Sequence, residues 1–372
     1  MKYYLVAGEA SGDLHGANLM KALKERDSEA DFRFFGGDLM NAEGGTIVKH
    51  FADMAFMGFF EVAANLNNIL NNLKFCKADI AAWQPDVLVL IDFPGFNLKI
   101  AEFAKKNGLL VCFYISPKVW AWNQKRVLKI KRIVDHLFCI LPFEVDFYRK
   151  WGMEVDYVGN PLLDAVAAFK PDVGFLVKHK LTGQKIIALL PGSRRQEISR
   201  LLPEMISVTE RFPGYRFVVA GAPSFKQDYY EQFIYQKNIP VIFNATYDLL
   251  SHAEAAIVAS GTAVLETALF NVPELLVYKG HPISIAIARA VVKIKFIGLV
   301  NLIMDDTVIK ELIQQDCTPE NIAAELDNIL NNKSYREKML ADYDKLDEKM
   351  GKPGASAKTA GLIIKYASKK RV

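Results

Sequence analysis

Short apolar runs alternate along this chain with glycine-bearing loops and helix-period segments. Runs such as residues 87–91 and 110–115 contain no charged residue, which is typical of strands buried on both faces of a parallel sheet. The pattern pauses after residue 140 and restarts at residue 186. The expected strands are residues 3–7, 87–91, 110–115, 137–140, 186–190, 217–220, 241–243, 256–259 and 275–278. This alternation predicts an α/β fold of two Rossmann-like lobes, each with a parallel sheet.

The domain boundaries follow from the restart of the pattern. A chain of 372 residues exceeds one ordinary core, and the polar stretch 163–181 is the expected linker. We predict a first lobe over residues 1–164, a second over 165–344, and a helical tail over 345–372 that packs back on the first lobe. Ligands of open parallel sheets bind at the carboxyl ends of the strands, so we expect both sheets to face a central cleft that holds the site.

Composition excludes several classes of protein. Hydrophobic residues make up 51% and charged residues 24% of the chain, which excludes a disordered or disulfide-stapled protein. A net charge of +4 argues against bulk nucleic-acid binding but suits an anionic surface or a phosphate-bearing substrate. The four cysteines lie far apart and predict reduced thiols in a cytosolic protein rather than a metal cluster. No uncharged run reaches the roughly 20 residues that span a bilayer.

Three loops of the first half carry candidate site residues. Residues 8–13 follow a strand and open a helix, so their N–H groups could meet an anion or a sugar hydroxyl; a tight turn capped by Asp13 is the alternative. Asp92 directly follows a buried strand, where desolvation would suit a general base; a helix cap is the alternative. Residues 114–122 hold two tryptophans and Lys118, which suits a sugar phosphate or an exposed basic helix.

Two loops of the second half resemble anion cradles. Residues 190–197 (LPGSRRQE) end a strand and begin a helix, and the guanidinium of Arg194 suits phosphate oxygens; surface basic residues are the alternative. Residues 259–266 repeat the pattern with small hydroxyl residues, and Glu266 one turn later could accept hydrogen bonds from a ribose diol. A simple helix cap explains that second loop equally well.

Residues 54–73 form an amphipathic stretch with bulky apolar residues at its start. Such a stretch could rest on a membrane or receive an acyl chain. Ordinary lobe core is the alternative.

Together these motifs resemble the lipid-A-disaccharide synthase family, inverting glycosyltransferases of the two-Rossmann-lobe (GT-B) type. The first half is similar in AGEASGD-x-HGA (7–17), MGFFEV (57–62), PDVLVLIDFPGFN (85–97) and SPKVWAWNQKR (116–126). The second half is similar in LPGSRRQE (190–197), ASGTAVLE (259–266) and GLVNLI (298–303). The blocks follow one another in order from residue 5 to about residue 320.

The resemblance implies a reaction and a set of residues. UDP-2,3-diacylglucosamine would donate its sugar to 2,3-diacylglucosamine 1-phosphate, giving a β-1,6-linked disaccharide 1-phosphate and UDP, with no metal and no cofactor. Asp92 would act as the base and Arg194 would hold the diphosphate. The other positions expected near the UDP-sugar are Ser193, Glu197, Ser260, Gly261, Thr262, Glu266 and Asn301. The positions expected around the acceptor sugar are Glu9, Ser11, Gly12, Lys118, Trp122 and Arg126.

The resemblance also favours membrane contact. Both substrates would carry acyl chains, so a peripheral protein on the cytoplasmic face of the anionic inner membrane is expected; a homodimer is left open, and no nucleic-acid partner is expected. The residues assigned to membrane or acyl contact are Phe56, Met57, Phe59, Phe60, Val62 and Leu66. Two positions depart from the family pattern: Gly95 replaces a frequent second acid and Asn160 a frequent histidine. A UDP-N-acetylglucosamine 2-epimerase-like enzyme and a non-catalytic nucleotide-sugar or lipid-binding module are the alternative functions.

Overall fold

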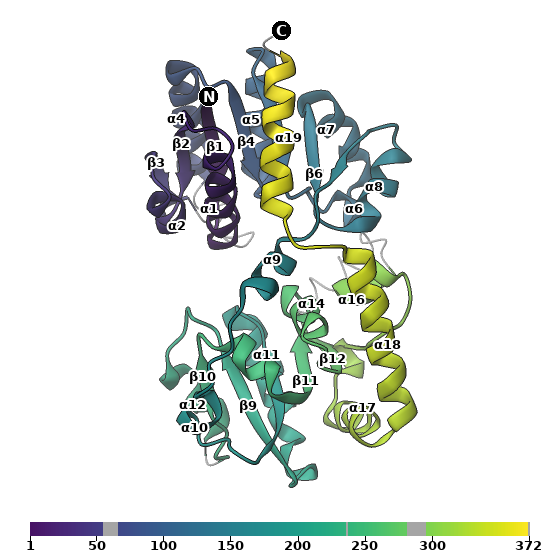
Figure 1. Ribbon diagram of the computed structural model, residues 1–372. Coiled ribbons are helices and arrows are strands. Elements are labelled where there is room, and N and C mark those ends of the chain that lie inside the picture. The colour runs from purple at the N-terminus through teal and green to yellow at the C-terminus, as the bar shows by residue number, and fades with distance from the viewer. Residues whose placement is uncertain (55–65, 236, 281–294, 371–372) are drawn as a thin grey trace. The chain divides into compact units, whose positions relative to one another are not determined.

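Two separate parallel sheets organise the chain (Figure 1). The computed structural model describes residues 1–54, 66–235, 237–280 and 295–370. These residues form two units, one of Met1–Asp164 with Lys352–Val372 and one of Ala165–Gly351. Both sheets are flanked by helices, as the sequence predicts for an α/β fold of two Rossmann-like lobes, and that prediction of fold class is confirmed.

The sheet of the first unit has seven parallel strands in the order β3-β2-β1-β4-β5-β6-β7. Its strands are β1 (Lys2–Ala7), β2 (Asp31–Gly36), β3 (Thr46–His50), β4 (Val87–Ile91), β5 (Leu110–Tyr114), β6 (His136–Cys139) and β7 (Asp156–Tyr157). The central strands β4 and β5 are buried along their whole length. Their unbroken apolar sequences follow from that burial, since water reaches neither face.

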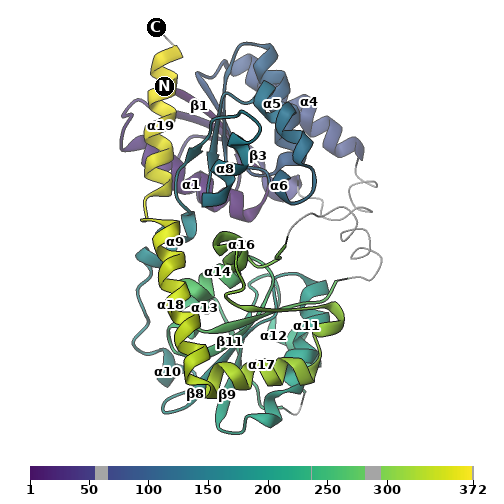
Figure 2. The ribbon, with the colours of Figure 1, turned by 90° about the vertical axis from the view of Figure 1, so that its right-hand side faces the viewer.

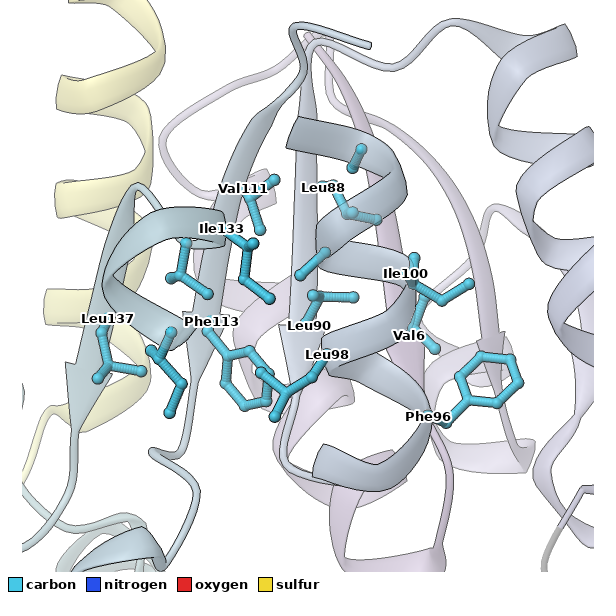
Figure 3. Packing of buried hydrophobic residues seen from close by; sticks show 14 of the residues in the cluster. Val6, Leu88, Leu90, Phe96, Leu98, Ile100, Val111, Phe113, Ile133 and Leu137 are labelled. Carbon is cyan, nitrogen blue, oxygen red and sulfur yellow. The ribbon is translucent and has the colours of Figure 1, made fainter. Parts of the chain in front are cut away.

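Side chains alternate between the two faces of this sheet, and each face has its own core. Leu88, Leu90 and Phe113 face one layer of helices (Figure 3), and Val87 and Val89 face the other. The first layer contains α4 (Leu66–Trp83), α5 (Pro94–Lys106), α7 (Val127–Ile133) and α8 (Pro142–Arg149). The second contains α1 (Ala10–Lys24), α2 (Asp38–Ala42) and α19 (Ala355–Lys370). Figure 2 shows α19 and α4–α5 on opposite sides of the sheet.

The second unit repeats the architecture with six parallel strands in the order β10-β9-β8-β11-β12-β13. The strands are β8 (Lys185–Leu190), β9 (Tyr215–Gly221), β10 (Val241–Phe243), β11 (Ala253–Ala259), β12 (Glu274–Tyr278) and β13 (Lys310–Ile313). The helices are α10 (Phe175–Lys178), α11 (Arg195–Ser207), α12 (Gln227–Ile234), α13 (Thr246–Ser251), α14 (Thr262–Leu269), α16 (Leu299–Met304), α17 (Pro319–Asn331) and α18 (Lys333–Met350). Strand β8 lies between β9 and β11, so the loops after β8 and β11 emerge side by side.

The C-terminal segment returns to the first unit. Helix α19 lies beside α1 in Figure 1 and buries Ala360, Ile363 and Ala367 against β1 and β5. The proposed start of this tail at residue 345 falls inside α18, and the structure places the change of unit at Gly351–Lys352 instead. Buried Met339, Leu346 and Met350 hold α18 on the second unit, which explains why the helix does not divide at residue 345.

The predicted linker, residues 163–181, is partly helical. Helix α9 (Pro161–Ala168) begins with proline at its first position and continues with helix-forming Leu and Ala, which favours a helix. Asn160 precedes it, and its Oδ1 accepts a hydrogen bond from the Leu162 N–H at 3.0 Å. No helix among the described residues combines the length and the apolar character that crossing a bilayer requires.

Candidate functional site

Three residues at the carboxyl ends of β4 and β5 have left-handed backbone conformations. The φ angles are 44° at Asp92, 48° at Phe93 and 67° at Ile115. Non-glycine residues avoid this region, and such strain is concentrated at functional sites. The strained turn at Asp92 therefore supports the sequence prediction that this strand end belongs to the site.

Asn97 of α5 holds that turn in place. Its buried Nδ2 donates to the carbonyl oxygens of Val6 (3.2 Å), Ile91 (3.2 Å) and Asp92 (2.7 Å). One side chain thereby ties the end of β1 to the end of β4. Asn97 was not predicted from sequence, where its only signal was a polar residue between the apolar Phe96 and Leu98, both of which are buried.

Asp92 lies in an environment that favours its protonated form. Burial raises the pKa of its carboxyl, and the nearby charge of Glu9 raises it further. The charge of Lys118 and the Phe93 N–H lower the pKa and partly offset these effects. A carboxylate with raised proton affinity at a strand end has the property that a general base needs.

In the segment of residues 8–13, Gly8 and Glu9 connect β1 to α1, and residues 10–13 form the first turn of α1. A Cβ atom at Gly8 would overlap the Phe93 ring, and one at Gly12 would lie 3.2 Å from the Ala7 Cβ. Gly12 is therefore packing surface rather than an open sugar contact, which corrects that expectation. Ser11 is exposed and Glu9 half-buried, so both reach the surface, and their contact with the acceptor sugar stays a prediction.

Asp13 caps a neighbouring helix rather than its own. Its carboxylate accepts hydrogen bonds from the N–H groups of Gly37 (2.7 Å), Leu39 (3.0 Å) and Met40 (3.1 Å) at the start of α2. The alternative in which Asp13 caps its own turn is therefore wrong, because Asp13 lies within α1 and caps α2 instead.

Lys118, Trp122 and Arg126 lie close together after β5. Helix α6 (Val119–Trp122) starts directly after Lys118, which is exposed. The Trp122 side chain is 48% exposed, and the Arg126 guanidinium lies 4.9 Å from the centre of its ring. This aromatic and cationic pair presents a surface that suits a sugar ring bearing a phosphate.

In the second unit, the turn after β8 closes on Glu197. Gly192 has a φ of 99°, and the Glu197 carboxylate accepts hydrogen bonds from the N–H groups of Ser193 (3.1 Å) and Arg194 (3.2 Å). Glu197 thus occupies donors that were expected to hold a diphosphate. The contact of Glu197 with the nucleotide stays a prediction; in the structure its carboxylate is the hydrogen-bond partner of the loop.

The two neighbouring arginines have different surroundings. The Arg194 side chain is 68% exposed and pairs only with Glu197 among the described residues, at 3.2 Å. The Arg195 guanidinium stacks over Phe225 (5.5 Å) and Tyr229 (4.6 Å). Arg194 is therefore the arginine that is free to meet an anion.

The loop after β11 lies beside the Gly192 turn, because Leu190 is paired with Val258. Gly261 and Thr262 are exposed at the start of α14, and no described side chain caps this helix. Ser260 Oγ lies 3.4 Å from the Ile297 carbonyl oxygen. The uncapped N–H groups of an eight-residue helix give the loop the character of an anion cradle.

Glu266 lies on α14 and faces Tyr247 of α13. The Tyr247 hydroxyl donates to Glu266 Oε1 at 2.7 Å. Burial raises the pKa of Glu266, and the hydrogen bond from Tyr247 lowers it. Among the described residues, the hydrogen bond from Tyr247 engages one carboxylate oxygen of Glu266, which leaves the other to accept from a hydroxyl.

Asn301 was expected to lie at the surface that binds the UDP-sugar, but its side chain is not at the surface. It is fully buried; its Nδ2 donates to the Ile309 carbonyl (2.9 Å) and Glu311 Oε1 (3.0 Å), and its Oδ1 accepts from the Val308 and Ile309 N–H groups. All its hydrogen-bonding atoms are engaged. Asn301 therefore shapes the loop before β13 rather than touching a nucleotide, and its partner Glu311 was not predicted.

The residues assigned to membrane contact lie mostly outside the described part of the chain. They are Phe56, Met57, Phe59, Phe60 and Val62, together with the side chain of Leu66. Within the described part of the same stretch, Met54 and Leu73 are buried in the core and Leu70 is 42% exposed. The stretch thus contributes both to the lobe core and to an exposed apolar surface.

Two features bear on the remaining predictions from sequence. Cys76, Cys112, Cys139 and Cys317 are buried and unpaired, as expected for reduced thiols. Within the described ranges, no three His, Cys, Asp or Glu side chains form a metal-binding group.

Solved structures share this fold across nearly the whole chain. UDP-GlcNAc 2-epimerase from Neisseria meningitidis bound to UDP-GlcNAc has a TM-score of 0.68 at 13% identity and covers 98% of this chain and all of its own. The glycotransferase of kitacinnamycin has a TM-score of 0.67 at 12% identity, with 98% of each chain covered. At such low identity these structures establish the fold alone.

Sequence relatives are closer. Lipid-A-disaccharide synthases from Syntrophus aciditrophicus and Trichlorobacter lovleyi are 40% and 38% identical, over 98% and 97% of this chain and 97% and 96% of their own lengths. The synthase from Myxococcus xanthus is 37% identical over 99% of this chain and 98% of its own. A family model described as lipid-A-disaccharide synthetase matches residues 3–362. The chain therefore belongs to the lipid-A-disaccharide synthase family of glycosyltransferases.

Proposed function

We propose that this protein transfers the sugar of UDP-2,3-diacylglucosamine to 2,3-diacylglucosamine 1-phosphate. The products are the β-1,6-linked lipid A disaccharide 1-phosphate and UDP. Membership of the family carries this conclusion, because relatives at 37–40% identity over nearly the full chain are lipid-A-disaccharide synthases. The protein is accordingly a glycosyltransferase of lipid A biosynthesis.

Asp92 acts as the general base in this proposal. Its carboxylate removes the proton from the acceptor 6-hydroxyl while that oxygen attacks C1 of the donor sugar. The bond from C1 to the diphosphate breaks on the opposite side, UDP leaves, and the configuration at C1 inverts. The raised pKa of Asp92 and its fixed backbone turn support the assignment, because a base works best when its proton affinity and position suit the reacting hydroxyl.

The second unit holds UDP in this proposal. Arg194, Ser193 and the uncapped amides from Gly261 and Thr262 bind the diphosphate and stabilise the charge that develops as it leaves. Ser260 belongs to the same loop, and Glu266 accepts hydrogen bonds from the ribose hydroxyls. The exposure of Arg194 and the uncapped start of α14 support this part.

The surface of Lys118, Trp122 and Arg126 binds the acceptor 1-phosphate and its sugar. Glu9 and Ser11 follow β1, whose carboxyl end lies at the same edge of the sheet as that of β5. A stacked tryptophan and arginine offer a flat apolar face and a bidentate donor to one ligand, which supports this placement.

In this proposal the first unit contacts the cytoplasmic face of the anionic inner membrane. A groove of about 410 Å³ between α4 and α5 supports this. Its apolar floor includes Leu70 and Phe103, and its rim carries the lysines Lys74, Lys77, Lys99 and Lys106. Apolar area surrounded by lysines matches the boundary between acyl chains and anionic headgroups.

The groove gives a direct test of membrane contact. Replacing its four lysines with glutamine should weaken sedimentation with phosphatidylglycerol vesicles, whereas Lys333→Gln on the second unit should not. If both variants sediment with the vesicles as strongly as the parent protein, the groove is not the membrane-contact surface.

The activity itself is tested with purified protein and both acylated glucosamine substrates in detergent. We expect a product with the mass of the tetra-acylated disaccharide 1-phosphate, and UDP release only when both substrates are present. Conversion of soluble UDP-N-acetylglucosamine without lipid would favour the epimerase alternative. Tight UDP binding with no product would favour a binding module.

A further inference from the structure

The loop between β5 and α6 is fastened to α8 at two points. Tyr148 Oη lies 2.8 Å from Ser116 Oγ and 3.4 Å from the Pro117 carbonyl oxygen. At the other end of this loop, within α6, the Trp120 Nε1–H donates to Glu144 Oε1 at 3.2 Å. Lys118 lies between these two fastenings and is exposed.

Glu144 has more partners than a helix cap requires. Its Oε2 accepts hydrogen bonds from the N–H groups of Leu141 (3.0 Å) and Ile140 (3.2 Å), which satisfies the start of α8. Its other oxygen is left for Trp120, whose ring also packs edge-on against Phe143 at 4.9 Å. Because Glu144 is only 1% exposed, every one of these donors offsets the loss of its hydration.

Asp92 is joined to the strand that carries this loop: its N–H donates to the Tyr114 carbonyl oxygen at 3.0 Å, at the end of β5 and four residues before Lys118. The charges near Asp92 come from Glu9, which raises the pKa of the carboxyl, and Lys118, which lowers it. The proton affinity of Asp92 therefore depends on how closely the loop holds Lys118 to it, since the Coulomb energy falls with distance.

We propose that Glu144 and Tyr148 hold the β5–α6 loop in the position that keeps Lys118 beside Asp92, which makes both of them positioning residues for the transfer reaction. This inference rests on the proposed role of Asp92 as the base. It assigns a functional part to α8, none of whose residues was a candidate from the sequence.

The surroundings of Glu144 make this fastening sensitive to pH. Burial raises the pKa of Glu144 to about 7, although the hydrogen bonds from Leu141, Trp120 and Ser116 lower it. Cys139, Tyr148 and Tyr157 are the other titratable groups whose charge couples to Glu144. Below that pH Glu144 is protonated and becomes a weaker acceptor for the Trp120 N–H, so the loop is held less firmly.

Conservative variants separate positioning from stability. Trp120→Phe removes the donor but keeps an aromatic ring against Phe143, Tyr148→Phe removes only the hydroxyl, and Glu144→Gln removes the charge. We expect each to lower kcat about 10- to 100-fold, since small displacements at a reacting centre cost that much, with the KM for UDP-diacylglucosamine unchanged. The acidic limb of the kcat/KM profile should move to higher pH, because Asp92 loses the charge that lowers its pKa.

Two further variants complete the test. Lys118→Met should shift the acidic limb in the same direction, and the double variant Lys118→Met, Trp120→Phe should show no additional shift. The control is Tyr4→Phe, which removes another buried tyrosine hydroxyl of the first unit, bonded at 2.7 Å to Asp79, and should leave the limb in place. The inference is overturned if the acidic limb stays at its wild-type pH in the Glu144, Trp120 and Tyr148 variants. It is also overturned if Trp120→Phe shifts the limb further in protein that already carries Lys118→Met.

A measurement independent of turnover distinguishes this inference from the proposed function. The Asp92 carboxyl can be titrated by NMR in protein with ¹³C-labelled aspartate, assigned with Asp92→Asn. A higher pKa in Trp120→Phe and Tyr148→Phe supports the positioning role even if Asp92 proves not to be the base. An unchanged Asp92 pKa in both variants contradicts the positioning role even if Asp92→Asn is inactive.

Discussion

The strand-end loops of the two units are stabilised in different ways. In the first unit, buried side chains of α5 and α8 form hydrogen bonds to the strand-end loops. Asn97 bonds the turn at Asp92, and Tyr148 and Glu144 bond the two ends of the segment that carries Lys118. In the second unit, the loop after β8 is closed by its own Glu197, and the loop after β11 leaves the start of α14 uncapped. The first-unit loops are therefore held by buried hydrogen bonds, whereas the second-unit loops keep hydrogen-bond donors near the protein surface.

The difference corresponds to two chemical tasks. A general base needs a fixed position and a tuned proton affinity, which buried hydrogen bonds and strained backbone provide. A diphosphate that must bind and leave needs donors that can change partner, such as exposed amides and an exposed arginine. Substitutions in the first-unit loops should therefore affect turnover, whereas substitutions in the second-unit loops should affect the binding of UDP.

The largest effect is expected for Asp92→Asn. Loss of the base should lower kcat about 100- to 10,000-fold, with UDP affinity unchanged because Asp92 belongs to the first unit. Wild-type turnover should fall as the pH drops through the raised pKa of Asp92. Glu9→Gln is the comparison: it removes a charge that raises this pKa, so the acidic limb should move to lower pH. Full activity of Asp92→Asn would exclude Asp92 as the base.

Arg194→Met should have the next largest effect and should appear in binding. Loss of a charge-assisted hydrogen bond of about 1.5–3 kcal/mol predicts that UDP binds about 10- to 100-fold more weakly, as measured by calorimetry. Arg195→Met is the matched control, because its guanidinium packs on Phe225 and Tyr229 instead. Comparable loss of UDP affinity in both variants would mean that the exposure of Arg194 does not identify the phosphate ligand.

Much of this architecture could be predicted from sequence because buried parallel strands leave a simple signal. Residues 87–91 are apolar throughout, and β4 has those bounds. The strands Asp31–Gly36, Thr46–His50, Asp156–Tyr157 and Lys310–Ile313 were not predicted. Each contains charged residues within a short run. Three of them, β3, β7 and β13, lie at a sheet edge, and the fourth, β2, lies next to one, where one side of the strand is less buried.

The site was predictable only where a residue's neighbours in sequence reveal its role. Asp92 follows a strand directly, and Arg194 follows a glycine turn. Asn97 acts on Val6, 91 residues away, and Glu144 acts on Trp120, 24 residues away. Such pairs are brought together by the fold, so no local spacing could indicate them.

Asn97→Ala tests whether the first-unit loops need their internal support. Three buried carbonyl oxygens would lose a donor, which should cost about 1–3 kcal/mol in the free energy of unfolding. The relaxed turn should also lower kcat about tenfold by misplacing Asp92. Asn301→Ala is the matched variant in the second unit, where the buried asparagine holds the loop before β13. Asn301→Ala should lose similar stability but should change the KM for the UDP-sugar instead of kcat. The same kinetic change in both variants would contradict the division of tasks.

Glu197→Gln should give the smallest effect, in the direction of tighter UDP binding. The carboxylate accepts from the amides of Ser193 and Arg194 and from the Arg194 side chain, so an arriving diphosphate competes with it for the same donors. A neutral amide is a weaker competitor by about 1 kcal/mol, the difference between charged and neutral hydrogen bonds, which corresponds to about fivefold in affinity. Titration of UDP into both proteins at several salt concentrations measures this difference. Weaker binding in Glu197→Gln would mean that the carboxylate orders the loop for UDP rather than competing with it, and the second-unit loops would then resemble those of the first unit.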